Sequence, residues 1–286
     1  MGLMKADLYR FVFRGDCGSL RGLARNNLEI LQGITPQGNS ALHVAASRGH
    51  HEMLKLLIRL KPGLLLMKNI KDETPLHRAA AAGELQVVQL LLNINRRRAQ
   101  ENVDLEIGSV FEPDEFGRPV NIDNETALHY AARGGHLRIV ENILGRVNDI
   151  ERIVNNAGES ALYTACDHGK YHVAWRLLNQ GAFDGDTRRD GQTCLHVAIH
   201  TDQIDLALLL LRERNELAEE ADGSGNMPLH IATLHCSLCL VRELLHIAPH
   251  TSFHVNEAKM APIHIASQQG YTEIIESLID ETPHCI

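Results

Sequence analysis

The chain has 286 residues, of which 44% are apolar and 4% aromatic, and its formal net charge at pH 7 is −8. This length and apolar content suffice for a substantial core, and the low aromatic share favours packed short helices over an aromatic-rich β-sandwich. A nucleic-acid-binding surface is disfavoured, because such a surface needs an excess of Lys and Arg to displace counterions from phosphates.

The first sixteen residues contain a helical segment rather than a targeting signal. Charged residues at Lys5, Asp7, Arg10 and Arg14 interrupt every apolar run there, so no secretory signal is expected. No later run approaches the 18 apolar residues that a membrane helix needs. The cysteines are scattered and are expected to be reduced thiols of a cytosolic protein, at Cys17, Cys166, Cys194, Cys236, Cys239 and Cys285.

Seven segments then repeat one pattern, and a weaker copy, ADLYRFVFRGD, precedes them at residues 6–16. The seven are SALHVAASRGH at 40, TPLHRAAAAGE at 74, TALHYAARGGH at 126, SALYTACDHGK at 160, TCLHVAIHTDQ at 193, MPLHIATLHCS at 227 and APIHIASQQGY at 261. Six of the seven have a histidine at the fourth place, and the steps between fourth residues are 34, 52, 34, 33, 34 and 34. The array therefore has a period near 34 residues with one insertion.

Within each segment the residue types predict two antiparallel helices. Ser or Thr at the first place, as in Thr74, can cap a helix, and Pro75 suits its first turn. A glycine such as Gly83 ends the helix with a positive φ, and the apolar residues 87–91 supply a second helix. The insertion is expected between Ile94 and Ile122, as an irregular loop rather than another repeat, because glycine and proline recur in it.

The pattern resembles the T-P-L-H-x-A-A-x-x-G-H signature of ankyrin repeats over nearly the whole chain. The resemblance implies an all-α solenoid of about eight stacked helix-turn-helix units in one domain, 1–286, with the insertion loop within 95–122. The units would start near residues 6, 40, 74, 126, 160, 193, 227 and 261.

Four further features resemble the plant ankyrin-transmembrane proteins of the accelerated-cell-death type. They are the opening LYRFVFRGD, the PGLL of residues 62–65, the insertion after the third unit and the closing TPHCI. The resemblance implies a cytosolic array, at the cytosolic face of the plasma membrane in the full-length protein. It also implies further repeats, a C-terminal membrane segment called the PGG domain, and roles in defence signalling and cell death.

The last helix, residues 271–279, is as apolar as an internal one and lacks the polar outer face of a terminal cap. A continuation of the chain that covers this helix is therefore expected. The alternative is a naturally short protein whose last helix frays or dimerises.

Two groups of residues could suggest a metal site. Neighbouring repeat histidines would lie about 8 to 10 Å apart, too far to share a metal at a ligand distance of about 2.1 Å, so a structural role is expected for His43, His77, His129, His196, His230 and His264. Cys236 and Cys239 form only half of a zinc site, and we expect small-residue packing for both. No metal, cofactor or catalytic residue is predicted, and no motif of an enzyme is present.

A partner is expected to bind the loop tips and the exposed residues of the first helices, which the resemblance places on the concave side. The fourth and fifth residues after each repeat histidine, or after Tyr163, should be exposed. In the fourth to sixth units this predicts a polar groove of Asp167, His168, His200, Thr201, Leu234 and His235, with rim residues Glu159, Arg189, Asp190, Gln192 and Asn226. The alternative is an ordinary solvated surface.

The leading functional hypothesis is a non-catalytic protein-binding scaffold in plant defence signalling. The partners are other proteins, and a membrane is reached only through a segment that this chain lacks. A regulatory ankyrin domain of an enzyme such as a kinase, or a soluble nuclear or cytoplasmic adaptor, would share the same repeats. The nuclear alternative rests on Arg96, Arg97 and Arg98 alone, and these cations also suit a helix end.

Overall fold

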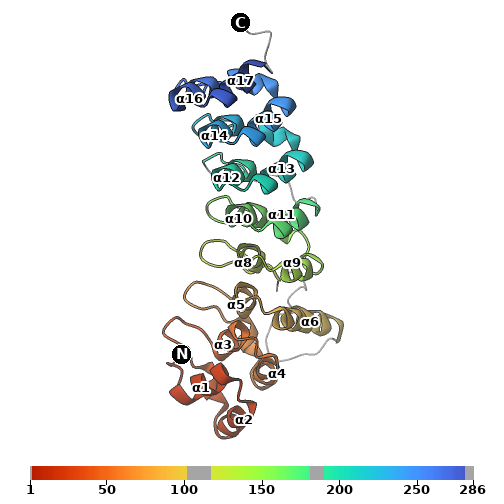
Figure 1. Ribbon diagram of the computed structural model, residues 1–286. Helices are drawn as coiled ribbons and strands as arrows, with labels where there is room; N and C mark the ends of the chain where they lie inside the picture. The colour runs from red at the N-terminus through yellow and green to blue at the C-terminus, as the bar shows by residue number, and fades with distance from the viewer. Residues whose placement is uncertain (1, 102–116, 181–189, 281–286) are drawn as a thin grey trace. The chain divides into compact units, whose positions relative to one another are not determined.

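The computed structural model describes residues 2–101, 117–180 and 190–280 (Figure 1). Its contacts divide the chain into two compact units, unit 1 from Met1 to Asn156 and unit 2 from Ala157 to Ile286. The described residues form helices and turns, with isolated β-bridges only at Leu3, Ile34 and Ser40. The prediction of an all-α fold is therefore confirmed.

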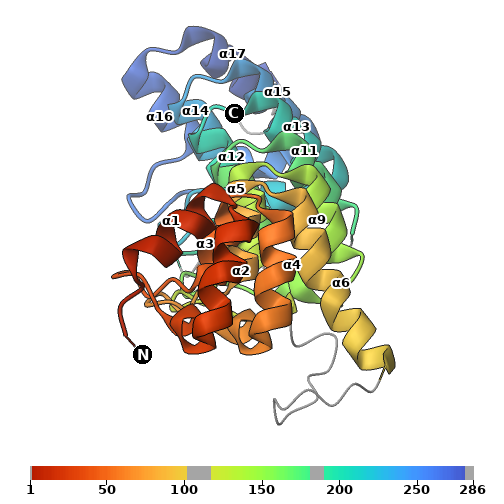
Figure 2. The same cartoon turned by 90° about the horizontal axis from the view of Figure 1, so that it is seen from below.

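Unit 1 contains paired helices, each pair made of an inner helix followed by an outer helix. The inner helices are α1 (Ala6–Arg14), α3 (Ala41–Ser47), α5 (Pro75–Ala82) and α8 (Ala127–Gly134), and the outer helices are α2 (Cys17–Asn26), α4 (His51–Leu60), α6 (Leu85–Glu101) and α9 (Leu137–Leu144). Short 3-10 helices follow three of the pairs, at η1 (Leu28–Gln32), η2 (Pro62–Leu66) and η3 (Ile150–Arg152). Within this unit α3 packs on α5 and α5 on α8, while α2 packs beside α4, as Figure 2 also shows.

Unit 2 repeats the arrangement. Its inner helices are α10 (Ala161–Asp167), α12 (Cys194–His200), α14 (Pro228–Leu234) and α16 (Pro262–Gln269), and its outer helices are α11 (Tyr171–Leu178), α13 (Ile204–Glu213), α15 (Leu238–Ile247) and α17 (Thr272–Asp280). The 3-10 helices are η4 (Asn215–Glu219) and η5 (Pro249–Phe253). The inner helices α10, α12, α14 and α16 pack in sequence order, and α17 packs on α15.

The inner helices are short because both ends are specified locally. Ser or Thr precedes the first turn in most repeats, and Pro75 starts α5 where its missing N–H costs no hydrogen bond. The turn after the inner helix needs a left-handed residue, which is Gly83 in one repeat with φ 78°. Asp202 and Cys236 take the same conformation at the equivalent places in unit 2, with φ 55° each.

The helix α6 continues to Glu101 and so includes Arg96, Arg97 and Arg98, the cations that suit a helix end. The physical reason is composition, since Arg, Ala, Gln and Glu in residues 96–101 are all strong helix formers. Most of the predicted insertion, residues 102–116, lies outside the described residues.

Replacing residues 102–116 with a Gly-Ser linker of equal length should leave the unfolding midpoint within about 2 °C of the wild-type value. The expectation follows from the glycine and proline in that stretch, which predict a loop that adds no repeat. Differential scanning calorimetry checks it. A fall of several degrees would mean that the stretch packs on the array.

The last described helix, α17, buries one face. Ile274 and Leu278 are buried, Ile275 is half-buried, and Ile279 is exposed. The helix therefore packs on α15 through part of its apolar surface. Among the described helices, each is too short or too polar to cross a membrane.

Candidate protein-binding surface

The repeat histidines hold the inner helices in place. In unit 1 the Thr74 backbone N–H donates to His77 Nδ1 at 3.1 Å, and the Thr74 hydroxyl lies 2.9 Å from the same nitrogen. Because Nδ1 accepts, the proton of the neutral ring sits on Nε2, which donates to the Glu125 carbonyl at 3.1 Å. His43 makes the equivalent contacts, with Ser40 and with the Glu73 carbonyl.

These histidines are buried and therefore neutral at pH 7. Burial lowers the pKa of His43 and that of His77 to about 4 each. In unit 2, burial also lowers the pKa of His196 and of His230, and their Nε2 atoms donate to the carbonyls of Asn226 and Met260. For these four histidines the predicted structural role is confirmed, since both ring nitrogens are used within the repeats.

The six predicted groove residues of unit 2 lie at the carboxyl ends of three inner helices. Asp167 and His168 end α10, His200 and Thr201 end α12, and Leu234 and His235 end α14. All six are exposed, and Leu234 exposes 48% of its surface. The sequence predicted this exposure from their distance to the repeat histidine.

Two of these residues touch each other. His200 Nδ1 lies 3.1 Å from His235 Nε2, and the rings meet edge to face with centroids 5.2 Å apart. Partial burial, followed by the charge of His235, lowers the pKa of His200. One ring nitrogen of the pair must carry a proton and the other must be free, so the contact needs at least one neutral histidine.

The groove residues also have polar contacts within unit 2. The Thr201 hydroxyl donates to the Val197 carbonyl at 2.8 Å, and His168 Nδ1 lies 3.3 Å from Asp167 Oδ2. Gln203, which the sequence did not single out, donates from Nε2 to the Cys166 carbonyl and to the Thr201 hydroxyl. The side chains at the ends of α10 and α12 are thus held in defined positions.

The predicted rim residues differ in how exposed they are. Asp190 is exposed, and its carboxylate accepts from the Gln192 N–H. Asn226 is half-buried, with Nδ2 donating to Asp222 Oδ2 and Oδ1 accepting from Asn256. Glu159 and Gln192 are also half-buried, and Arg189 lies outside the described residues. Asn226 is therefore mainly a hairpin residue, because its side chain joins two successive loops.

Unit 1 contains a polar network that the sequence analysis missed. Tyr130 donates from its hydroxyl to Glu73 Oε1 at 2.7 Å, although the two residues are 57 positions apart. Burial alone would raise the pKa of Glu73, but the hydrogen bonds of Tyr130 and Asn69 outweigh it and lower that pKa. Glu125, at the equivalent place of the next repeat, forms an ion pair with Arg133, which lowers the pKa of Glu125 against the effect of burial. The available signal was a glutamate four residues before a repeat histidine.

A hollow on the outer helices of unit 2 was also missed. It has a volume of about 790 Å³ and lies between α11 and α13, where Tyr171, Leu208 and Arg212 line it. Tyr171 and the nearby Trp175 expose 38% and 48% of their surfaces. The outer helices thus carry exposed aromatic side chains, which a search restricted to inner helices overlooks.

The prediction that Cys236 and Cys239 pack as small residues is wrong. Both cysteines are exposed. Cys236 takes the left-handed turn position with φ 55°, which turns it away from the core, and Cys239 lies on the solvent face of α15. Across the described part of the chain, no three His, Cys, Asp or Glu side chains are placed to hold a metal ion together.

Purified protein should contain much less than one zinc per chain, and EDTA should leave its unfolding midpoint unchanged. The reason is that Cys236 and Cys239 provide two thiols, whereas a structural zinc site needs four ligands. Elemental analysis after gel filtration checks the prediction. Zinc near one equivalent that is lost in the double variant Cys236→Ser/Cys239→Ser would contradict it.

Comparisons with known proteins identify the same repeated helix pairs that the structure contains. The family model described as "Ankyrin repeats (3 copies)" matches residues 12–103, 106–186 and 128–219, which together exceed half of the chain. Protein ACCELERATED CELL DEATH 6 of Arabidopsis thaliana is 27% identical over 78% of this chain and 34% of that protein. A probable E3 ubiquitin-protein ligase, XBOS32 of Oryza sativa subsp. japonica, is 29% identical over 69% of this chain and 35% of that protein.

A solved structure supports the same fold. The ankyrin repeat domain of Bcl-3, described as a member of the IkappaB protein family, superposes with a TM-score of 0.68 at 22% identity, covering 85% of this chain and 99% of that domain. The chain spans only about a third of the two plant relatives. The chain belongs to the ankyrin-repeat family, whose repeats form a protein-interaction fold that is generally not catalytic.

Proposed function

We propose that this protein is a non-catalytic scaffold that binds another protein through the groove of unit 2. The groove consists of Asp167, His168, His200, Thr201, Leu234 and His235. The observation that carries the proposal is the contact between His200 and His235 beside the exposed Leu234. Protein interfaces combine an apolar centre with a polar rim, and an exposed leucine among polar side chains fits that anatomy.

The biological setting is the second part of what we propose. The similarity to Protein ACCELERATED CELL DEATH 6 supports a role in plant defence or cell-death signalling, as the cytosolic part of a membrane protein. A second candidate, the regulatory ankyrin domain of an enzyme, is supported by relatives named as E3 ubiquitin-protein ligases. The full transcript separates the two, because a membrane segment would follow the repeats in one and a catalytic domain in the other.

Affinity capture from plant tissue tests the binding surface. The groove variant His200→Ala/Leu234→Ala/His235→Ala should lose at least one wild-type partner by tenfold or more in quantitative mass spectrometry. Its folding should be kept, because all three side chains are exposed.

The matched control is His246→Ala/His250→Ala/Val255→Ala. It removes two exposed histidines and one exposed aliphatic side chain from the same unit, away from the groove. The control should retain every wild-type partner. Equal retention by the groove variant and the control would refute the groove as the binding surface.

A further inference from the structure

One place in the repeat holds a large apolar residue everywhere except in the first outer helix. Fifteen positions after the repeat histidine, or after the residue that replaces it, the chain carries Ile58, Leu92, Leu144, Leu178, Leu211, Leu245 and Ile279. Ile58 and Leu92 are buried in unit 1. In α2 the equivalent residue is Ala24, so the side chain that fills this place in the next two outer helices is missing.

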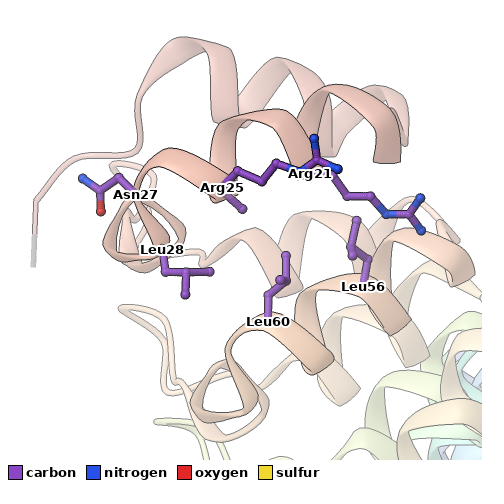
Figure 3. A pocket seen from close by; sticks show the side chains of 7 residues that line it. Arg21, Arg25, Asn27, Leu28, Leu56 and Leu60 are labelled. Carbon is purple, nitrogen blue, oxygen red and sulfur yellow. The ribbon is translucent and has the colours of Figure 1, made fainter.

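A hollow of about 530 Å³ lies at Ala24 between α2 and α4. Figure 3 shows Leu56 and Leu60 pointing from α4 toward α2, with Leu28 at the start of η1. Leu28 exposes 46% of its surface, and Leu60 is half-buried.

The upper edge of this hollow is basic. Arg21 and Arg25 follow each other at i, i+4 on α2, so they share one face of the helix, and both are exposed (Figure 3). No ion pair joins either guanidinium to a carboxylate of the described residues. By contrast, Lys55, one 34-residue step after Arg21, is paired with Glu52 at 2.9 Å. The hollow therefore has two cations that are free for an external anion.

We infer that this hollow, which we call the Ala24 pocket, is a second docking site that takes an acidic peptide segment with a bulky apolar anchor. The anchor side chain packs in the hollow against Leu28 and Leu60, beside the buried Ala24, which stands where later repeats have a larger residue. Carboxylates on both sides of the anchor pair with Arg21 and Arg25, and a carboxylate matches the planar guanidinium geometry. The formal charge of −8 makes such a basic site stand out from the rest of the chain.

The Ala24 pocket is independent of the groove in unit 2, since all of its lining residues belong to unit 1. It lies on outer helices, whereas the groove residues lie at the ends of inner helices, so the two sites share no residue. The affinity should fall with salt, because exposed ion pairs are screened beyond a Debye length of about 10 Å at 0.1 M.

Fluorescence anisotropy with a labelled twelve-residue peptide tests the inference. The peptide carries Leu-Phe between pairs of glutamates and is capped at both ends. It should bind the full chain saturably at low salt. Ala24→Ile should weaken binding at least tenfold, because the introduced side chain reduces the anchor space. Ala24 is itself only 3% exposed, so its enlargement can lower the stability of the fold, and binding is compared at a temperature at which both proteins are folded.

Charge reversal provides the second arm. Arg21→Glu/Arg25→Glu should also weaken binding at least tenfold, whereas Arg59→Glu/Arg138→Glu should not. The control pair changes the net charge equally at exposed arginines on α4 and α9. A peptide with lysine in place of glutamate, or with alanine in place of Leu-Phe, should not bind.

Three results would overturn the inference. One is the absence of saturable binding of the acidic peptide at millimolar concentration. Another is binding that Ala24→Ile and Arg21→Glu/Arg25→Glu leave unchanged. The third is a different occupant, shown by anionic phosphatidylserine vesicles that compete with the peptide only in the wild type, or by a dimer in sedimentation that Ala24→Ile converts to monomer.

Discussion

The free energy of unfolding should fall steeply as the pH drops from 6.5 toward 4, and most of the fall above pH 5 should come from buried histidines rather than carboxylates. His43 and His77 have a pKa of about 4 in the folded protein, against 6.5 for the same groups without burial. A histidine whose folded pKa is depressed binds fewer protons in the folded state, so its stability contribution is complete above pH 6.5 and is lost as the pH falls. Each of the two should cost about 3 kcal/mol over the whole window and about 2 kcal/mol by pH 5.

Urea unfolding at pH 7.5, 6.5, 5.5 and 5.0 measures this loss. Glu73, Glu125 and Asp222 also have lowered pKa values, but their contributions are present above their unfolded values of 4.5 or 3.8 and are lost chiefly below pH 4.5. Measurements at pH 5 and above therefore isolate the histidines. An unfolding free energy that stays constant from pH 7.5 to pH 5 would show that these rings are not held neutral.

The substitution His77→Ala should destabilise unit 1 by about 3–5 kcal/mol at pH 7. It leaves the Thr74 N–H and the Glu125 carbonyl without their histidine partners, and each buried group left unpaired costs about 1–3 kcal/mol. The lost ring also leaves a cavity, because His77 exposes only 1% of its surface.

Two further measurements show whether the ring acts as described. His250→Ala, at an exposed histidine, should change stability by no more than about 0.5 kcal/mol. His77→Ala should also reduce the loss of unfolding free energy between pH 6.5 and pH 5 by about 2 kcal/mol, which is the contribution of one buried histidine. A cost below about 1 kcal/mol, with an unchanged pH profile, would mean that the ring contributes little to holding the repeats together.

Much of this fold is encoded in short stretches of sequence, which is why it could be predicted. The Thr74 cap, Pro75 at the first turn and Gly83 at the end of α5 act within one helix, so their effects need no knowledge of distant residues. The exposure of His200 and Leu234 followed from their spacing to a repeat histidine in the same way.

The sequence by itself therefore determined the period of the repeats, the ends of most inner helices and the exposure of the groove residues, because each depends on neighbours within about one turn or one repeat. Only the tertiary structure decided which side chains meet across repeats. The contact of Tyr130 with Glu73 and that of His200 with His235 depend on how successive hairpins and helices pack, over 57 and 35 residues of chain. The Ala24 pocket belongs to the same class. The hollow lies where α2, η1 and α4 meet, and its presence depends on how these elements pack rather than on any local pattern.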